Sequence, residues 1–361
     1  MLHFFPHYAN DVSEHPFAVE LRRCQVPHRF FASVVDRTYT TLAERLFVAY
    51  PRMIWVALGS AIRSLLLSRP RPVAAVVGSD IEALIFGLIR MLLRLRTIVV
   101  FETLIIAPRR SRRLTALAHG YFGFILSLID VAICHSHAET VQYAAAFPRA
   151  RCRFACVPYG TTVTNHRALI AKYSNRTENA DIVTAGRSGR DYTTLAKAIE
   201  DLPCRLRIIC NLASSVAGII QSRQIMVMRD CFGPDYIDTL AKSLFVVVPL
   251  ASDDVSAGQM VLLQASALRK AVVVTRTTTT LEYATDTEDA LFVDIGDVHQ
   301  MRTAIRRLLE DASLRDRLAG KALERFERCY TTEQYVRNMV AAITAAAAPG
   351  MADALSHGSR H

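Results

Sequence analysis

Two glycines and two arginines stand together in the segment ADIVTAGRSGRDYTTLAKAIEDL, residues 180–202. An apolar run precedes them and a helix-like run follows. Gly186 and Gly189 allow backbone N–H groups to come close to a ligand, and the start of the following helix adds unpaired N–H groups and the positive end of a dipole. Arg187 and Arg190 add cations whose planar forks match phosphate oxygens. The segment predicts a cradle for a diphosphate; an ordinary turn with two surface arginines is the alternative.

A second segment of interest is LAKSLFVVVPLASDDVSAGQMVLLQASALRKAVVVT, residues 240–275. A strand-like run ends at Pro249, a polar loop covers 251–258, and Gly258 opens a helix-like run that leads to another strand. Ligands of doubly wound sheets bind at the carboxyl ends of the strands, so this loop is expected to face a ligand. Gln264 lies one to two turns inside the helix. A plain helix–strand unit is the alternative.

Both segments need a scaffold that presents a loop after a strand. Continuous apolar runs alternate with helix-like stretches along most of the chain, as expected where helices cover both faces of a sheet. The pattern predicts an α/β protein of two doubly wound domains with parallel sheets. Strands are expected near 73–78, 97–102, 130–134, 153–157, 181–185, 205–210, 225–228, 244–249, 271–275 and 290–294, and helices near 81–95, 112–128, 138–146, 191–200, 236–242, 258–268 and 297–309.

The length of 361 residues suits two domains. Composition places an N-terminal, basic domain at 1–162, a polar linker with a short helix at 163–180, and a second domain at 181–340. Residues 341–361 are expected to be a helix end and a tail.

Charge is distributed unevenly between the two expected domains. Residues 1–162 hold 19 basic and 10 acidic side chains, all the basic ones arginine, and therefore carry +9 of the total +10. This bias predicts an anionic partner, namely nucleic acid, a membrane surface or a phosphorylated substrate. No apolar run is long enough to predict a spanning helix. Arginines lead into apolar helices within 81–128, which predicts peripheral membrane contact, with a core helix that has a solvated basic start as the alternative.

The eight cysteines lie mostly in apolar runs and show no metal-ligand spacing. This favours buried reduced thiols and a reducing compartment. The first residues lack a basic stretch followed by a long apolar run, so no signal peptide is expected. These features predict a cytoplasmic protein that contacts the inner face of the cell membrane.

Taken together, these stretches resemble the retaining glycosyltransferases of family 4, which share the GT-B fold of two Rossmann-like domains facing a cleft. The resemblance covers residues 120–340 and extends only loosely to the first 100. DVAICHSHAETVQYAAAFPRARCRFACVPYGTT is similar to the end of the family's first domain. Glu282 and the pair Gly296-Asp297 match its closing region.

The resemblance also covers the first segment, where TAGRSGRDYTTLAKAI is similar to the family's phosphate-binding turn. Arg187 then matches the arginine of that turn, and Arg190 its lysine. The resemblance implies a nucleotide-sugar donor in the second domain. The residues expected to hold it are Gly186, Arg187, Ser188, Arg190, Asp253, Asp254, Ser256, Ala257, Gly258 and Gln264.

The chain departs from the family at a Glu-x7-Glu motif, whose aligned positions are Ser256 and Gln264. In the family the first glutamate meets the transferred sugar and the second the nucleotide ribose. The amide of Gln264 can still hydrogen-bond ribose hydroxyls, whereas Ser256 lacks both charge and reach. Asp253 and Asp254, or backbone N–H groups at 257–259, are candidates to contact the sugar instead.

Candidate catalytic residues of the first domain are Glu102, Asp11 and His15. A histidine often found in the family's first domain is absent, and Glu102 occupies its place. Glu102 either acts on an acceptor hydroxyl or caps the next segment. In the family the first loop faces the acceptor, which makes Asp11 and His15 cleft candidates; a helix start there is the alternative.

The sequence thus predicts a hexosyltransferase that moves a sugar from a UDP- or GDP-sugar to an acceptor hydroxyl, in polysaccharide or glycolipid biosynthesis at the membrane face. The resemblance implies retention, no essential metal ion and no cofactor. Two alternatives remain open: a degenerate GT-B protein that binds without turnover, and a sugar-nucleotide epimerase of the same fold. Nucleic-acid binding, suggested by the pI of about 9.4, is disfavoured because the basic residues adjoin apolar helices without interleaved aromatics.

Overall fold

The computed structural model describes residues 1–5, 16–31, 44–106, 111–161, 163–173, 181–187 and 189–347. The chain forms two compact units, Met1–Pro158 with Thr332–His361 and Tyr159–Thr331. The expected second domain extended to 340, but helix α14 (Thr332–Thr344) groups with the first unit. Burial of Val336, Met339 and Ile343 in an apolar cluster of the first unit explains this placement.

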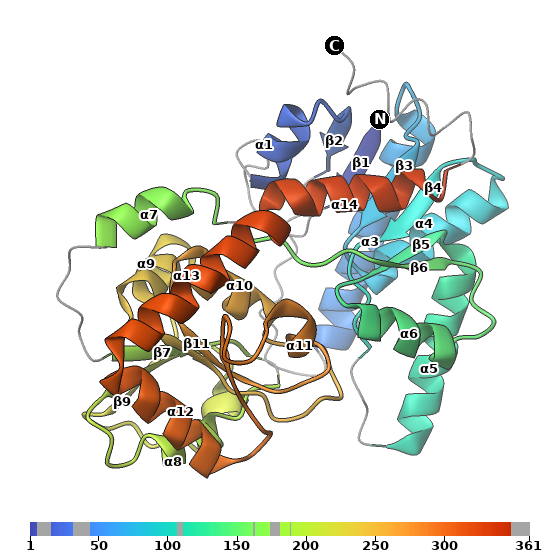
Figure 1. Cartoon of the computed structure of the whole chain (residues 1–361). Coiled ribbons are helices and arrows are strands. Elements are labelled where there is room, and N and C mark those ends of the chain that lie inside the picture. Colours follow the sequence, from blue (N-terminus) through green and yellow to red (C-terminus); the bar gives the residue numbers. More distant parts are fainter. Residues whose placement is uncertain are drawn as a thin grey trace. The chain divides into compact units, whose positions relative to one another are not determined.

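The first unit contains a six-stranded parallel sheet in the order β2-β1-β3-β4-β5-β6. One apolar cluster includes alternate strand residues such as Phe5 and Val77, and a second includes Phe4 and Val76. Side chains of successive strand residues point to opposite faces, so both faces of the sheet are covered (Figure 1). The elements are β1 (Leu2–Phe5), α1 (Pro16–Arg23), β2 (His28–Phe30), η1 (Arg45–Ala49), α3 (Tyr50–Ala61), η2 (Ile62–Leu67), β3 (Ala74–Val77), α4 (Asp80–Leu92), β4 (Ile98–Phe101), α5 (Arg112–Leu128), β5 (Val131–Cys134), α6 (His137–Ala146), β6 (Arg153–Cys156) and α14.

The second unit contains another six-stranded parallel sheet, in the order β12-β11-β10-β7-β8-β9. Its two faces also bury separate clusters, one with Val246 and Val248 and the other with Val247. The elements are α7 (His166–Tyr173), β7 (Asp181–Ala185), α8 (Tyr192–Ala198), β8 (Arg205–Ile209), η3 (Ala213–Val216), β9 (Ile225–Met228), α9 (Gly233–Lys242), β10 (Val246–Val248), α10 (Gln259–Ala267), β11 (Val272–Thr275), α11 (Thr280–Tyr283), β12 (Leu291–Val293), α12 (Val298–Glu310) and α13 (Ala312–Cys329).

The prediction of two doubly wound α/β units is confirmed. Every expected strand is present within a few residues of its predicted position. The expected linker at 163–180 contains α7, whose Tyr173 is buried in the second unit. All eight cysteines are free thiols. In the described ranges, no helix has both the length and the apolar character needed to cross a membrane.

Candidate functional site

Strand order defines a switch point in the second unit. From β7 the chain proceeds to β8 on one side, and β10 pairs with β7 on the other side. Adjacent strands whose connections leave in opposite directions create a crevice at their carboxyl ends, where open α/β sheets bind ligands. The turn 186–190 follows β7 and the loop 251–258 follows β10. Both predicted segments therefore lie at this switch point.

The turn after β7 is built around Gly186 and Arg190. Gly186 has a φ of +122°, and a β-carbon there would lie 2.6 Å from Cζ of Arg190. The Arg190 guanidinium therefore occupies the space that the missing side chain leaves. Its Nε donates to the carbonyl oxygen of Ala185 over 2.8 Å, which fixes the cation at the end of β7. Sequence spacing predicted a cation here, and the structure adds that it folds back over the glycine.

Two tyrosines surround Arg190. The Tyr192 hydroxyl donates to the carbonyl oxygen of Gly186 over 2.5 Å, and the Tyr236 hydroxyl donates to Oε1 of Gln264 over 2.7 Å. Burial raises the pKa of both phenols, so they remain neutral donors. Burial also lowers the pKa of Arg190, opposed by Tyr192, Tyr236 and Cys210. A cation in a low-dielectric setting interacts more strongly with an arriving anion than one in water.

The turn and the loop after β10 lie against each other. The Ala251 N–H donates to the Gly189 carbonyl over 2.9 Å, and the Asp191 N–H donates to the Pro249 carbonyl over 3.2 Å. A β-carbon on Gly189 would lie 3.6 Å from Cβ of Ala257. These contacts bring the two predicted segments into one site.

The open helix start of this site belongs to α10, not α8. Asp191 caps α8, because its Oδ1 accepts from the Thr194 N–H over 2.9 Å. That bond satisfies one N–H group of the predicted helix start. Gly258 begins α10 with a φ of +92° and no side-chain cap, and a β-carbon there would lie 3.0 Å from Cγ1 of Val248. A close-packed glycine thus starts the helix that carries Gln264.

The two departures from the Glu-x7-Glu motif lie on this loop and helix. Gln264 is buried on α10, and its Oε1 is used by Tyr236. That bond uses one of the two lone pairs of the oxygen, and the amide nitrogen is a donor that suits a ribose hydroxyl. Ser256 accepts from Nε2 of Gln259. This contact joins the loop to the first residue of α10.

The remaining predicted donor residues are more exposed. Oδ1 of Asp253 accepts from the Thr278 N–H over 2.8 Å, and Oδ2 accepts from its hydroxyl, which ties the loop to the segment after β11. Asp254 is exposed. Arg187 is also exposed, and its carbonyl accepts from the Ser215 hydroxyl over 2.6 Å. Ser188 lies outside the described residues.

In the first unit, Glu102 follows β4. Its Oε1 accepts from the Tyr335 hydroxyl of α14 over 3.4 Å. Next to it, Thr103 Oγ1 lies 3.1 Å from Nε2 of His135, whose Nδ1 lies 2.9 Å from the Val157 carbonyl. Burial lowers the pKa of His135 to about 4, so this imidazole is neutral near pH 7 and serves as a fixed hydrogen-bonding group.

Asp11 and His15, the other two catalytic candidates, lie outside the described residues. The sequence interpretation did not include Tyr192, Tyr236 or Tyr335. Tyr192 is two positions after Arg190, so the local sequence could have indicated it. Tyr236 and Tyr335 come from helices remote in sequence, and no motif marks them.

Comparisons with known proteins concern the fold and the sequence of the second unit. Residues 168–311 match the family model of the glycosyl transferases group 1. No match was found among curated protein sequences. Among solved structures, a UDP-forming α,α-trehalose-phosphate synthase from Burkholderia xenovorans aligns with a TM-score of 0.72 and 11% identity, covering 95% of this chain and 99% of that chain.

Two further structures align over nearly the whole chain. Sucrose-phosphate synthase from Thermosynechococcus elongatus has a TM-score of 0.69 and 15% identity, covering 94% of this chain and 96% of its own. HepE from Anabaena has a TM-score of 0.63 and 11% identity, covering 95% and 99%. The chain shares the two-domain GT-B fold of these structures. More particularly, its second unit carries the sequence pattern of the group 1 glycosyl transferases.

Proposed function

We propose that this protein transfers a hexose from a nucleotide-sugar donor to an acceptor hydroxyl. The observation that carries the proposal is the Arg190 guanidinium, held over Gly186 at the switch point of the second sheet. A fixed cation there stabilises the charge that develops on a departing diphosphate. The ligands of a structural neighbour support a nucleotide-sugar donor, since HepE was solved with UDP and glucose and with UDP-glucose.

The other predicted donor residues have roles that follow from their places. Arg187 is the exposed cation that reaches the outer phosphate oxygens, and N–H groups at the uncapped start of α10 face the sugar diphosphate. The amide nitrogen of Gln264 donates to the ribose. Family resemblance adds retention of configuration and no need for a metal ion or cofactor. On the acceptor side, Glu102 orients or deprotonates the hydroxyl, and Asp11 and His15 are candidates in the first loop.

Nucleotide binding and turnover test the proposal separately. Thermal unfolding in the presence of UDP, GDP and their sugars should show a shift for one nucleotide, and Arg187→Ala should abolish that shift. Incubation with the matching nucleotide sugar and an acceptor should then release nucleoside diphosphate in amounts that depend on Arg190. Absence of a shift with every nucleotide contradicts the donor assignment.

A second candidate is a protein that binds nucleotide sugar without transfer. It is favoured by the side chains at the two motif positions, because Ser256 and Gln264 supply no carboxylate. A nucleotide-dependent thermal shift without release of diphosphate in the presence of diverse acceptors would support it. Conversion of the sugar nucleotide to an epimer without any acceptor would instead identify an epimerase.

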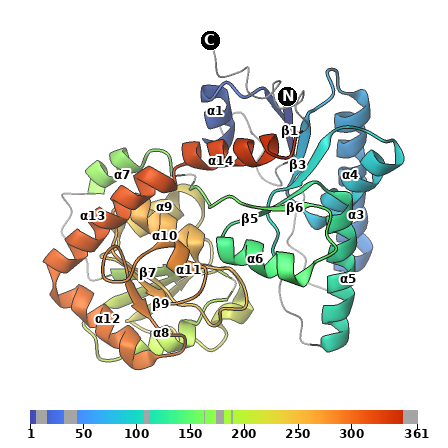
Figure 2. The same cartoon turned by 45° about the vertical axis from the view of Figure 1, so that its right-hand side comes forward.

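We further propose that the acceptor is presented at an anionic membrane surface, in polysaccharide or glycolipid assembly. Large apolar side chains are exposed on η1 and α3, where Phe47 is 79% and Trp55 is 72% exposed. The first half of α5 likewise exposes Leu117, and in both views it extends away from the strands of its own unit (Figures 1 and 2). Helix α4, which packs against both α3 and α5, connects the two surfaces.

Charge favours a lipid surface as the occupant. No acidic residue occurs at 45–79 or 103–129, while the arginines Arg52, Arg112 and Arg113 are exposed beside the apolar side chains. Basic helices with exposed apolar and aromatic side chains lie in the headgroup region of anionic bilayers. The proposed surface thus includes 44–62 together with part of the predicted segment 81–128, whose α4 is partly buried.

Trp55 is the only tryptophan of the chain and reports directly on this contact. Its emission should shift to the blue with phosphatidylglycerol vesicles and stay unchanged with phosphatidylcholine vesicles. Phe47→Ser with Leu117→Ser should weaken binding to the anionic vesicles, whereas Ile220→Ser, an exposed apolar site of the second unit, should not. Equal behaviour with both lipids contradicts the membrane assignment and leaves the donor assignment standing.

A further inference from the structure

A cavity of about 350 Å³ opens in the second unit, away from the site described above. Its lining includes Leu244, which precedes β10, and Lys270 and Ala271, which precede β11. The cavity therefore lies at the amino ends of these strands, whereas Arg190 and Gly258 follow carboxyl ends. Its volume falls within the roughly 300–1,000 Å³ of small-molecule sites.

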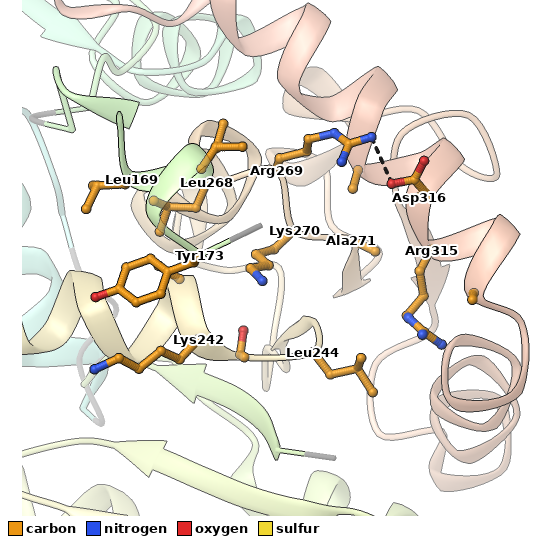
Figure 3. Close-up of a pocket in the computed structure, with 15 residues that line it drawn as sticks. Leu169, Tyr173, Lys242, Leu244, Leu268, Arg269, Lys270, Ala271, Arg315 and Asp316 are labelled. Carbon is orange, nitrogen blue, oxygen red and sulfur yellow. Dashed lines mark ion pairs between the residues drawn. The ribbon is translucent and has the colours of Figure 1, made fainter. Parts of the chain in front are cut away.

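Cations dominate the polar lining of this cavity (Figure 3). Lys242 ends α9, Arg269 and Lys270 follow α10, and Arg315 lies near the start of α13. Among the described residues that line it, the one carboxylate is Asp316, which pairs with Arg269 over 2.8 Å. Like charges around a small volume repel one another, and an anion in the middle relieves that repulsion.

Hydrogen bonds position Arg315 beside the cavity, and the backbone conformation positions Arg269. Nη1 of Arg315 donates to the carbonyls of Leu308 over 2.6 Å and Leu309 over 3.2 Å, which fixes the guanidinium plane. Arg269 has a φ of +53°, a left-handed conformation that usually selects glycine after a helix. The exposed ion pair with Asp316 contributes little by itself, and a ligand of opposite charge in the cavity would add a second partner for this guanidinium.

The opposite wall is apolar and aromatic. Leu169 and the ring of Tyr173 on α7 face the cavity, together with Leu268 (Figure 3). Nζ of Lys242 lies 5.6 Å from the centroid of the Tyr173 ring and 3.6 Å from Asp238. Arg269, Lys270 and Arg315, together with an aromatic wall that Lys242 borders, suit an anion with a small organic body rather than a bare ion.

The two helices that reach this cavity also shape the donor site. Helix α9 carries Tyr236 and ends at Lys242, and α10 carries Gln264 and ends just before the Arg269-Lys270 pair. The 2.7 Å bond between Tyr236 and Gln264 joins the two helices; Tyr236 lies near the start of α9, and Gln264 lies about one turn before the end of α10. A ligand that draws the two helix ends together therefore acts on the geometry of that bond.

We propose that this cavity is a second anion site that takes a phosphorylated small molecule and is coupled to the donor site through α9 and α10. The coupling, but not the binding, rests on the proposed function. Coupling between two sites is reciprocal, so each ligand changes the affinity of the other by the same factor.

Calorimetric titration of the full chain with glycerol 3-phosphate and with pyrophosphate, both with UDP present, tests the site. We expect saturable binding of at least one probe, weakened tenfold or more by Lys270→Met and by Lys270→Glu. Lys321→Met, an exposed lysine on α13 outside the cavity lining, should leave it unchanged. No binding of either probe at millimolar concentration, or binding equal in Lys270→Met, overturns the site.

The coupling has its own readout. UDP affinity should differ at least twofold with and without the bound probe, and this difference should vanish in Lys270→Met. A constant UDP affinity overturns the coupling. If UDP does not bind at all, the proposed donor assignment fails. The titration of the anionic probes without UDP still tests the cavity, because their binding should depend on Lys270.

Discussion

Each of the two units contains its own six-stranded parallel sheet. The units differ in whether the chain's own side chains cap the helices that follow the strands. In the first unit, α4 and α6 each begin with a Ser-x-x-Glu pattern. Glu82 accepts from the Gly78 N–H over 3.2 Å and the Ser79 hydroxyl over 3.1 Å, and Glu139 accepts from the His135 N–H over 2.9 Å. The buried glutamates accept from donors just before each helix, and the hydroxyls of Ser79 and Ser136 accept from the helix N–H groups of Glu82 and Glu139.

The switch point of the second unit is arranged differently. Helix α10 begins at Gly258 without a side-chain cap, and the turn after β7 holds the Arg190 cation. Asp191 closes α8, so the open start is that of α10. The comparison shows that the first unit closes the starts of α4 and α6 with its own side chains, whereas the proposed diphosphate site of the second unit combines the uncapped start of α10 with a fixed cation.

The largest expected effect is on the cation of the second unit. Arg190→Ala should weaken UDP binding by about 10- to 100-fold, because charge-assisted hydrogen bonds contribute about 1.5–3 kcal/mol. Isothermal titration measures this effect. Arg223→Ala, an exposed arginine of the same unit, is the control and should bind as the natural protein does. Unchanged affinity in Arg190→Ala would break the comparison, since the open turn would not be the diphosphate site.

The next largest effect is expected at Gly186, the glycine packed against the Arg190 guanidinium. Gly186→Ala places a β-carbon 2.6 Å from Cζ of Arg190 at a φ of +122°, which should lower the free energy of unfolding by about 1–3 kcal/mol and weaken UDP binding. Urea unfolding and titration measure both. Gly218→Ala, where nothing lies within 4 Å, should change neither. A fully stable Gly186→Ala would mean that the turn adapts without loss.

Acid should destabilise the first unit through its buried histidines. Burial lowers the pKa of His135 to about 4, and burial, helped by Arg29 and the N-terminus, lowers that of His3 to about 4. The unfolded chain binds a proton near pH 6.5 while the folded chain does not, so stability is lost as pH falls from about 6.5 towards 4. Each histidine contributes up to about 1.4 kcal/mol per pH unit in that window.

Urea unfolding at pH 7 and pH 5 measures this loss. His135→Gln should flatten the dependence on pH even if its stability at pH 7 is lower. An equally steep dependence in that variant would assign the effect to other groups.

The smallest expected effect concerns the closed helix starts. Glu139→Gln should cost about 1 kcal/mol of unfolding free energy through its capping bonds and leave UDP affinity unchanged. Glu200→Gln, an exposed site, is the reference for stability. A loss of UDP affinity in Glu139→Gln would contradict the statement that the capped helix starts of the first unit take no part in UDP binding.

Much of the fold could be predicted, because its central strands are continuous apolar runs. VVVT in β11 and VAIC in β5 are buried along their whole length, and only a doubly covered sheet needs such runs. Strand β2 is three residues with mixed burial, and short alternating runs carry little signal. Helix α14 was assigned to the second domain although it packs in the first, because an apolar helical pattern does not indicate which core it packs against.

The site was predictable where its residues are neighbours in sequence. Gly186 and Arg190 occupy one turn, and the glycine and cation spacing reveals them. Tyr236 is 46 positions beyond Arg190 and reaches it only because α9 packs beside α10. The capping of α8 by Asp191 was a local feature that the sequence interpretation did not use.

The sequence by itself determined the two parallel sheets, the glycine turn with its cations and the arginine excess of the first half, because each depends on residue type and local spacing. Only the tertiary structure decided which helix start is open, which tyrosines surround Arg190, and that Phe47 and Trp55 are exposed. Those features depend on contacts and burial between segments far apart in the chain, and sequence periodicity does not specify which apolar face finds a partner.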